Sequence, residues 1–358
     1  MRVLHVYKSS PTNSHGGVEK FISCLARNIK PLGVRSTVMS IGNVQRVEFH
    51  KSKYYTEIKC PQHFELASTK FSGHSIRILG RIIKKYDVIH LHHPDPFASQ
   101  IYTLSKNVGT VCVVTYHSDI VTQKWLEKLY RPLNSFFFKQ VNTIVFTSPQ
   151  YLTENQLGEA TQSKSYVIPI GIDEPPTSTK MYDEISKWQK ILPKKFILFV
   201  GQFRSYKGMI DLFNAMSKST YQLVIIGGGK LEARLQKIKL QKGLDNVTFL
   251  GELGEIDKYA VLNLCSALVL PSCTRAEAFG ISLVEAASVG KPLISCKIGT
   301  GTSFINIHNF TGIEVPPNEP ICLENAISSI LANEDTIKNF GRNARQHYLQ
   351  LFTAKKMA

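Results

Sequence analysis

Apolar residues recur along the chain in two rhythms, as short continuous runs and as longer stretches at helical spacing. In the first half, an apolar stripe that includes Val18, Phe21 and Leu25 predicts a helix directly after the first run. Near-continuous apolar strands that alternate with helices are typical of a parallel sheet covered on both faces. The runs that predict strands in this half are residues 3–7, 36–41, 88–91, 111–116 and 143–147.

A second alternation follows a break at residues 168–176, I-P-I-G-I-D-E-P-P. We expect α/β architecture with two doubly wound Rossmann-like domains that face each other across a cleft: residues 1–168, a linker region at 169–193, and residues 194–358. The length of 358 residues also exceeds what a single core usually serves. The predicted strands of this half are residues 196–200, 223–226, 247–250, 267–270 and 292–295, with helices at 231–242 and 281–289.

Composition narrows the class of protein. Apolar residues make up 43% and charged residues 20% of the chain, which is ordinary for a globular protein. No apolar run approaches the roughly 18–20 residues that cross a bilayer, and the N-terminus lacks a signal-peptide pattern. Seven scattered cysteines without C-x-x-C spacing favour reduced thiols. We expect a cytoplasmic protein, with peripheral association to the cytoplasmic membrane left open.

The net charge of +16 attracts polyanions such as nucleic acid, anionic lipid or phosphorylated substrates. Many soluble proteins are basic without such a partner, so the net charge alone does not identify a binding partner. Lys and Arg are spread over both halves of the sequence, which argues against a nucleic-acid-binding face.

Ligands of doubly wound sheets bind at the carboxyl ends of strands, and four loops there carry distinctive residues. Gly16 and Gly17, in S-H-G-G, precede the first helix and allow close approach of an anion, although paired glycines more often serve only a turn. Arg204 and Lys207 follow the strand at 196–200, and a guanidinium with an ammonium can grip a diphosphate. His117 ends the strand at 111–116 and could polarise a substrate oxygen or be structural.

The fourth loop holds two carboxylates eight residues apart. Glu277 lies in the predicted loop, and Glu285 lies about a turn into the helix that begins after a glycine. The backbone N–H groups of Phe279, Gly280 and Ile281 would be helix-end donors without partners. Donors for a phosphate and carboxylates for hydroxyls suit a sugar phosphate. For an isolated match, a capping carboxylate with an ordinary helical glutamate is the favoured interpretation.

Together these motifs resemble the retaining glycosyltransferases of GT-B fold, and within them family 4, typified by bacterial mannosyl- and rhamnosyltransferases. The resemblance runs through the chain in order, and the E-A-F-G-I-S-L-V-E segment is its most diagnostic part. The motifs are R-V-L-H-V-Y-K at 2–8, the glycines at 16–17, D-V-I-H-L-H-H-P at 87–94, T-Y-H-S at 115–118, I-P-I-G-I-D at 168–173, Y-K-G at 206–208, V-T-F-L-G at 247–251, E-A-F-G-I-S-L-V-E at 277–285 and G-T-G-T-S-F at 299–304.

The resemblance implies a role for each matching residue. His117 and Glu277 are the expected catalytic residues, with His117 at the reacting sugar and Glu277 on donor-sugar hydroxyls. The other implied roles are donor diphosphate for Arg204, Lys207, Gly16 and Gly17; donor sugar for Phe279, Gly280 and Ile281; ribose for Glu285; and the border of the base for Leu250 and Gly251.

The resemblance also implies a reaction. A hexose, mannose or a related 6-deoxyhexose, would pass with retention from a nucleotide sugar, GDP favoured over UDP, without a metal or other cofactor. The acceptor would be a lipid-linked or polysaccharide glycan of the cell surface, as in lipopolysaccharide O-antigen, exopolysaccharide or capsule biosynthesis. Two alternatives keep the fold: a nucleotide-sugar epimerase or phosphorylase, and a partner subunit without turnover.

Two departures from the family pattern stand out. Gln202 occupies a position where relatives often carry Arg, and the sequence ends at Ala358, where the family usually begins a last helix that crosses back onto the first domain. We therefore expect a crossover helix that is short or missing.

Three further patterns invite other interpretations. The histidines at 90, 92 and 93 could suggest a metal site, but no carboxylate pattern accompanies them, so we expect no metal. Gly227–Gly229 follows a strand but lacks the glycine spacing of a dinucleotide-binding loop, so we do not expect it to bind NAD. The aromatic and basic segment at 125–139 is either an interfacial membrane helix or a buried helix of the first domain.

Overall fold

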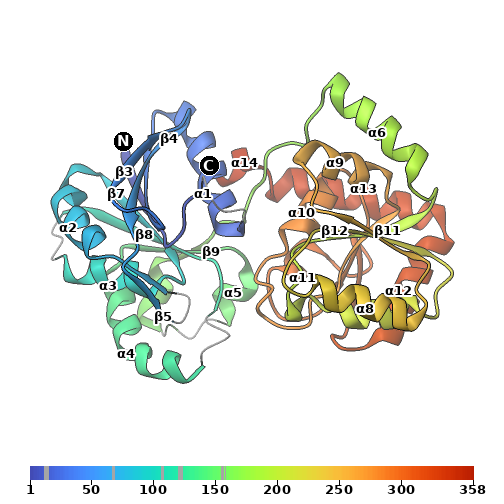
Figure 1. Ribbon diagram of the computed structural model, residues 1–358. Coiled ribbons are helices and arrows are strands. Elements are labelled where there is room, and N and C mark those ends of the chain that lie inside the picture. The colour runs from blue at the N-terminus through green and yellow to red at the C-terminus, as the bar shows by residue number, and fades with distance from the viewer. Residues whose placement is uncertain (12–15, 67–68, 106–108, 120–123, 155–156, 158) are drawn as a thin grey trace. The chain divides into compact units, whose positions relative to one another are not determined.

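The computed structural model describes residues 1–11, 16–66, 69–105, 109–119, 124–154, 157 and 159–358. The chain divides into two compact units, Met1–Gly171 with Ala354–Ala358, and Ile172–Thr353. Each unit is an α/β sandwich around its own sheet (Figure 1).

The first unit is built on an eight-stranded sheet of order β10-β9-β8-β7-β1-β2-β4-β3. Neighbouring strands pair in parallel except β3 with β4, which are antiparallel. The central strands are buried on both faces, as their apolar runs predict. The strands are β1 (Arg2–Val6), β2 (Arg35–Gly42), β3 (Glu48–Lys51), β4 (Tyr55–Pro61), β7 (Val88–His93), β8 (Val111–Tyr116), β9 (Thr143–Phe146) and β10 (Ser165–Val167), and a separate hairpin joins β5 (Phe64–Leu66) to β6 (Thr69–Phe71).

Helices of the first unit begin where the sequence places capping side chains. Ser72 accepts a hydrogen bond from the Ser75 N–H at 3.3 Å, and Asp95 accepts one from the Ala98 N–H at 3.1 Å. These caps satisfy N–H groups that the helix itself leaves without partners. The helices are α1 (Gly17–Ile29), α2 (Gly73–Ile82), α3 (Pro96–Leu104), α4 (Lys124–Gln140), α5 (Pro149–Thr153) and α14 (Ala354–Met357).

The second unit contains a six-stranded parallel sheet of order β13-β12-β11-β14-β15-β16. In chain order this is 3-2-1-4-5-6, the Rossmann arrangement, in which the strand order reverses between β11 and β14. The strands are β11 (Phe196–Val200), β12 (Gln222–Ile226), β13 (Val247–Gly251), β14 (Ala267–Leu270), β15 (Leu293–Cys296) and β16 (Gly312–Val315); the helices are α6 (Thr179–Ile191), α7 (Met209–Met216), α8 (Glu232–Lys242), α9 (Glu255–Leu264), α10 (Ile281–Ser288), α11 (Thr302–Ile305), α12 (Pro320–Ala332) and α13 (Glu334–Leu351).

Every strand predicted from the sequence is present, and the fold class is confirmed. The strands that were not predicted lack a clear apolar run. β3 and β5 are largely exposed, and β4 hides Glu57 and Lys59 in the interior, where apolar residues are the usual occupants.

The segment expected as a linker region contains a helix. α6 belongs to the second unit and packs against α9, where Trp188 Nε1 donates to Asp257 Oδ1 at 2.9 Å. The C-terminal return to the first unit exists as one short helix, α14, which packs against α1. Met357 of α14 is buried, and its sulfur accepts from the Gly171 N–H at 3.2 Å.

Candidate active site

The strongest candidate site lies in the second unit, at the point where the strand order of its sheet reverses. β11 and β14 are neighbours there, and the chain leaves their carboxyl ends at Gly201 and Pro271. Loops at such a reversal diverge and leave room for a ligand. All residues that the sequence assigns to diphosphate, sugar and ribose in this half follow β11 or β14.

Two glycines allow these loops to approach each other closely. Gly208 has φ 67°, and a Cβ on it would lie 1.9 Å from the Pro271 carbonyl oxygen. Gly227, after β12, has φ 136°, and its Cβ would lie 2.0 Å from the Gly201 carbonyl oxygen. Both positions need a residue without a side chain. The loops after β11, β12 and β14 are therefore held in contact through backbone.

Lys207 and Glu277, 70 residues apart, form an ion pair that joins the two loops. Their side chains are only 12% and 10% exposed. Ser272 Oγ donates to the same carboxylate oxygen, Glu277 Oε2, at 2.9 Å. Burial alone would lower the pKa of Lys207, but the charge of Glu277 outweighs it and raises that pKa, so the ammonium stays charged.

The N-terminus of α10 presents backbone donors beside this pair. Gly280 caps the helix with φ 90°, a left-handed conformation that favours glycine. Among the described residues, the N–H groups of Phe279, Gly280 and Ile281 have no hydrogen-bond partner. The loop that contains Gly301 supports them, since Gly301 N–H donates to the Ala278 carbonyl at 3.0 Å. Free helix-end N–H groups form an anion-binding position.

Glu285 lies one turn further along α10 and has a buried cationic partner. Lys258 Nζ, on α9, donates to Glu285 Oε1 at 2.7 Å and also to Glu255 Oε2 at 2.9 Å. Burial opposes the charge of Lys258, yet the two carboxylates outweigh it and raise its pKa. Lys258 therefore holds the Glu285 side chain in place, and that side chain keeps 11% exposure.

Arg204 differs from Lys207 in being exposed. Its guanidinium donates to Gln202 Oε1 at 3.3 Å, so the residue that departs from the family pattern holds the neighbouring cation. Leu250 and Gly251 end β13 and are half-buried. The Gly251 carbonyl accepts from the Gly227 N–H at 2.8 Å, which ties them to the same set of loops.

In the first unit, the predicted residues Gly16, Gly17 and His117 lie around the N-terminal part of α1. Gly16 is the N-cap of α1 and Gly17 its first residue; Ser14 and His15 of the same motif lie outside the described residues. Phe21 of α1 meets the His117 ring edge to face, with centroids 4.8 Å apart. The side chain of Glu19 folds back over Gly16, because a Cβ there would lie 2.3 Å from Glu19 Oε2.

His117 belongs to a buried group of imidazoles. Its Nε2 lies 3.1 Å from His92 Nδ1, and His92 Nε2 lies 3.3 Å from His5 Nδ1. Burial, with neighbouring imidazoles, lowers the pKa of His117 to about 3 and that of His92 well below its usual value. The group is therefore neutral near pH 7.

The same group brings together nitrogen atoms that could hold a metal. One ring nitrogen each of His5, His90 and His92 lies within 4.8 Å of the others. Neutral imidazoles are zinc ligands. These rings already have polar partners, however: His90 Nε2 lies 2.7 Å from Thr115 Oγ1, besides the contacts among the histidines themselves. The absence of a metal stays a prediction.

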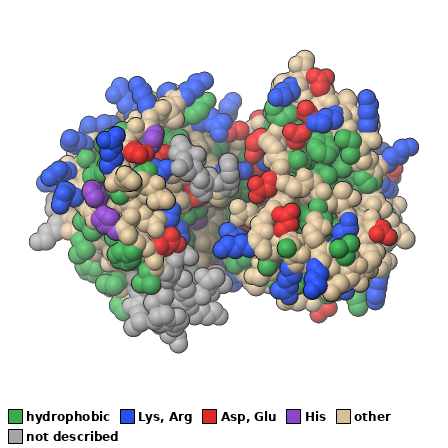
Figure 2. All heavy atoms as spheres, in the orientation of Figure 1, with side chains coloured by type: hydrophobic (Ala, Val, Ile, Leu, Met, Phe, Trp, Pro, Cys, Tyr) green, Lys and Arg blue, Asp and Glu red, His purple; other side chains and the backbone are tan. Residues whose placement is uncertain are grey.

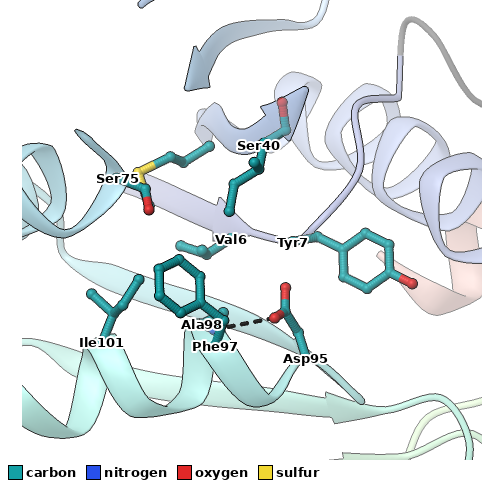
Figure 3. A pocket seen from close by; sticks show the side chains of 10 residues that line it. Val6, Tyr7, Ser40, Ser75, Asp95, Phe97, Ala98 and Ile101 are labelled. Atoms are coloured by element: carbon teal, nitrogen blue, oxygen red, sulfur yellow. Dashed lines mark hydrogen bonds between the residues drawn. The ribbon is translucent and has the colours of Figure 1, made fainter. Parts of the chain in front are cut away.

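Among the described residues, each unit has a cavity that can be compared with these positions; Tyr7, which lines the first, contacts the His92 ring with centroids 6.2 Å apart. In the first unit, a cavity of about 10 Å³ beside Asp95, Phe97 and Tyr7 is too small for a sugar (Figure 3). Burial raises the pKa of Asp95 to about 6. In the second unit, a cavity of about 520 Å³ is bordered by Glu174, Arg345 and Gly290, and Gly290 lies at the amino end of β15. The residues expected to bind the nucleotide sugar in this unit follow the opposite, carboxyl ends of β11 and β14.

Surface charge does not form a single patch on the face in view. Lys and Arg side chains there are interspersed with Asp and Glu on both units (Figure 2). In α4, Phe137 and Phe138 are buried, while Leu133 and Phe136 are 51% and 56% exposed. The side chains of residues 125–131 in this segment lie outside the described part. None of the helices among the described residues is long and apolar enough to cross a bilayer.

Two Rossmann-like units are the arrangement of the GT-B fold, and the second unit places a cation, a carboxylate and free helix-end N–H groups where its strand order reverses. Among solved structures, sucrose-phosphate synthase from Thermosynechococcus elongatus matches with a TM-score of 0.79 at 21% identity over 99% of this chain and 96% of that chain. Anabaena HepE in complex with UDP matches with a TM-score of 0.78 at 18% identity over 100% and 97%.

Sequence comparison names the family. Residues 15–174 match Glycosyltransferase Family 4 and residues 182–347 match Glycosyl transferases group 1. O-antigen chain mannosyltransferase C of Escherichia coli is 40% identical over 100% of this chain and 96% of that protein. D-rhamnosyltransferase WbpZ of Pseudomonas aeruginosa is 38% identical over 99% and 93%. The chain belongs to glycosyltransferase family 4, and its substrates are accordingly a nucleotide-sugar donor and a glycan acceptor.

Sequence reasoning missed three side chains that hold the candidate residues in place. Ser272 and Lys258 contact Glu277 and Glu285, and Glu19 covers Gly16. Lys258 sits three residues after Glu255, a spacing that signals only a surface pair. Its buried contact with Glu285 depends on how α9 and α10 pack, which the sequence pattern does not encode.

Proposed function

We propose that this protein transfers a hexose, mannose or a related 6-deoxyhexose, from a GDP-sugar with retention of configuration. The acceptor is a lipid-linked or polysaccharide glycan in O-antigen biosynthesis. The observation that carries the enzymatic part is the buried Lys207–Glu277 pair at the sheet reversal, beside the free N–H groups of α10. The sugar and acceptor classes follow the two relatives that share about 40% of the sequence over its whole length.

Lys207 suits the donor diphosphate because its ammonium has three protons, of which Glu277 uses one. A fixed cation in a water-poor site stabilises the charge that develops on the departing nucleoside diphosphate. Arg204, exposed in the same loop, supplies a second contact to the diphosphate. The N–H groups of Phe279, Gly280 and Ile281 bind donor oxygens from the other side of the sheet reversal.

The two glutamates are suited to hydroxyl groups of the donor. Glu277 retains lone pairs beyond those used by Lys207 and Ser272, and these accept from sugar hydroxyls. Glu285, held by Lys258, accepts from the ribose. Leu250 and Gly251 border the base. In the first unit, the N-terminus of α1 at Gly16 and Gly17 is a position for a phosphate oxygen, and His117 binds an oxygen of the reacting sugar.

In the proposed step, the acceptor hydroxyl attacks the anomeric carbon on the face that the diphosphate leaves. The bond from the anomeric carbon to the acceptor oxygen forms as its bond to the phosphate oxygen breaks. The hydroxyl proton passes to the departing phosphate oxygen, so the scheme needs neither a protein nucleophile nor a metal.

The direct test is a donor screen followed by product analysis. Thermal stabilisation is measured with GDP-mannose, GDP-rhamnose, UDP-glucose and dTDP-rhamnose, and transfer is then assayed with a mannose-terminated lipid-linked oligosaccharide. We expect a GDP-sugar to stabilise most, and the anomeric coupling of the product to match that of the donor. Stabilisation without transfer favours a partner subunit, free epimerised sugar nucleotide favours an epimerase, and an inverted product contradicts retention.

A further inference from the structure

Three imidazoles of the first unit form a continuous chain across the sheet. His5 lies on β1, His92 on β7, and His117 directly after β8. The contacts are His5 Nδ1 to His92 Nε2 at 3.3 Å and His92 Nδ1 to His117 Nε2 at 3.1 Å. The rings stack, with centroids 5.5 Å and 5.4 Å apart. Phe21 packs its ring against His92 and His117 and so fixes both planes.

Each ring of the chain is buried and neutral. Burial lowers the pKa of all three histidines, and neighbouring imidazoles, above all that of His90, add to the effect. Other ionisable groups near α1 and β1 are Glu19, Tyr7 and Asp95, and Tyr7 experiences both carboxylates. A neutral imidazole has one N–H and one lone pair. His92 must therefore donate to one neighbour and accept from the other, and the chain can run in only two directions.

The far end of the chain selects the direction. His5 Nε2 is buried and has no hydrogen-bond partner among the described residues. If protons pointed toward His5, this nitrogen would carry an N–H without an acceptor, which costs about 1–3 kcal/mol. In the opposite direction it carries only a lone pair, and buried acceptors without partners are better tolerated than buried N–H groups.

We infer that His5 and His92 are positioning residues that hold His117 in the tautomer with its proton on Nδ1, so that His117 donates a hydrogen bond to an oxygen of the transferred sugar. His117 Nδ1 has no partner among the described residues, and the residue as a whole is 5% exposed. Because Nε2 is committed to His92, a neutral His117 has no accessible lone pair with which to deprotonate the acceptor. The use of the donor hydrogen bond rests on the proposed function, whereas the tautomer does not.

Nitrogen NMR of protein labelled with ¹⁵N-histidine tests the tautomer without any substrate. His117 is assigned in the wild-type protein by through-bond correlation of its ring nitrogens with its own backbone. We expect Nδ1 of His117 to be the protonated nitrogen and Nε2 to have the shift of an unprotonated ring nitrogen. The opposite pattern in the wild-type protein overturns the inference, and this spectrum needs no variant to fold.

Variants separate positioning from general stability. His92→Phe removes both contacts of the chain, and we expect His117 to shift toward protonation at Nε2. His90→Gln is the buried control for packing, since His90 lies beside His5 and His92 but makes its hydrogen bond with Thr115. It should leave the His117 tautomer unchanged, because the hydrogen bonds of the chain set that tautomer. An unchanged tautomer in a folded His92→Phe protein contradicts the inference. So does a wild-type spectrum that changes on treatment with a chelator, because a bound metal would then organise the rings.

Two amide substitutions of His117 test which ring nitrogen acts in the reaction. The Asn amide superposes on Nδ1 of a histidine and the Gln amide on Nε2, so His117→Asn should retain at least tenfold more kcat/KM than His117→Gln. Equal losses, or better retention by Gln, would show that the donor is not at Nδ1. If the tautomer is as inferred but no nucleotide sugar binds, the proposed function fails while the positioning role stands.

Discussion

Around their predicted site residues, the two units bury polar side chains by different chemical means. The second unit pairs full charges, Lys207 with Glu277 and Lys258 with Glu285. The first unit places neutral imidazoles in contact, from His5 through His92 to His117. Fixed charges suit a ligand that is itself ionised, such as a diphosphate, whereas neutral donors suit hydroxyl groups. Under the proposed function, the cation Lys207 therefore binds the diphosphate and the neutral His117 binds an oxygen of the sugar.

The largest effect should come from breaking the charged pair of the second unit. Lys207→Ala removes the cation proposed to bind the diphosphate and leaves the buried Glu277 without its ion-pair partner. We expect kcat to fall about 10²–10³-fold and unfolding free energy to fall by about 3–5 kcal/mol. Transfer assays and denaturant titration measure the two losses.

A double variant separates these losses. Lys207→Met with Glu277→Gln replaces the pair by neutral groups of similar size, so stability should recover substantially while transfer stays lost. Recovery of transfer in the double variant would contradict a role for charge at this site.

Lowering the pH should destabilise the first unit more than the second. Burial lowers the pKa of His90 to about 4 and those of His93 and His117 to about 3. Their unfolded-state pKa is about 6.5, so the unfolded chain binds more protons below that pH. The stability present above pH 6.5 is lost as pH falls toward 4, by about 2 kcal/mol for each such histidine at pH 5.

Asp95 has the opposite sign, because burial raises its pKa to about 6 and protonation stabilises the folded state. One carboxyl does not offset several histidines. Hydrogen exchange at pH 7 and pH 5, corrected for intrinsic rates, should show loss of protection in β1, β7 and β8 but not in β11 and β14. Equal losses in both sheets would contradict the assignment, since the second unit holds only His308 and His347.

A smaller effect is expected at the second charged pair. Lys258→Met leaves Glu285 without its buried cation and should raise KM for the donor about tenfold, with a smaller change in kcat. Lys187→Met is the matched control, because Lys187 pairs with Glu184 on the exposed side of α6, and exposed pairs contribute little. Isothermal titration with the donor compares the two variants, and equal affinities would refute a positioning role for Lys258.

The smallest effect concerns the departure from the family pattern. Arg204 is exposed and contacts only Gln202 among the hydrogen bonds described. Arg204→Ala should weaken donor binding about two- to tenfold, and Gln202→Arg should restore part of that loss by supplying a cation in the same loop. Donor titrations of the single and double variants measure both shifts. No restoration would indicate that residue 202 does not reach the diphosphate.

Much of the fold could be predicted because apolar runs mark buried parallel strands directly. β11 and β14 match their predicted bounds, and the loops after them contain the candidate residues. The sequence could not reveal that Lys207 contacts Glu277, because that contact depends on strand order rather than on spacing. β4 was missed because Glu57 and Lys59 are buried in it.

The histidine chain was hidden for a similar reason. His90, His92 and His93 drew attention as a local cluster, but His5 did not. His5 comes opposite His90 only through the parallel register of β1 and β7. Register and packing, which are properties of the assembled sheet, decide which polar residues become partners.

The central claim is that Lys207 and the adjoining N–H groups bind the donor diphosphate. Calorimetric titration with GDP, GMP and guanosine measures what each phosphate adds to affinity, in the wild-type protein and in Lys207→Met with Glu277→Gln. We predict that the wild-type protein binds GDP at least tenfold more tightly than GMP. This ratio should fall severalfold in the double variant, in which Arg204 and the N–H groups remain. An unchanged ratio in a folded double variant would contradict the claim.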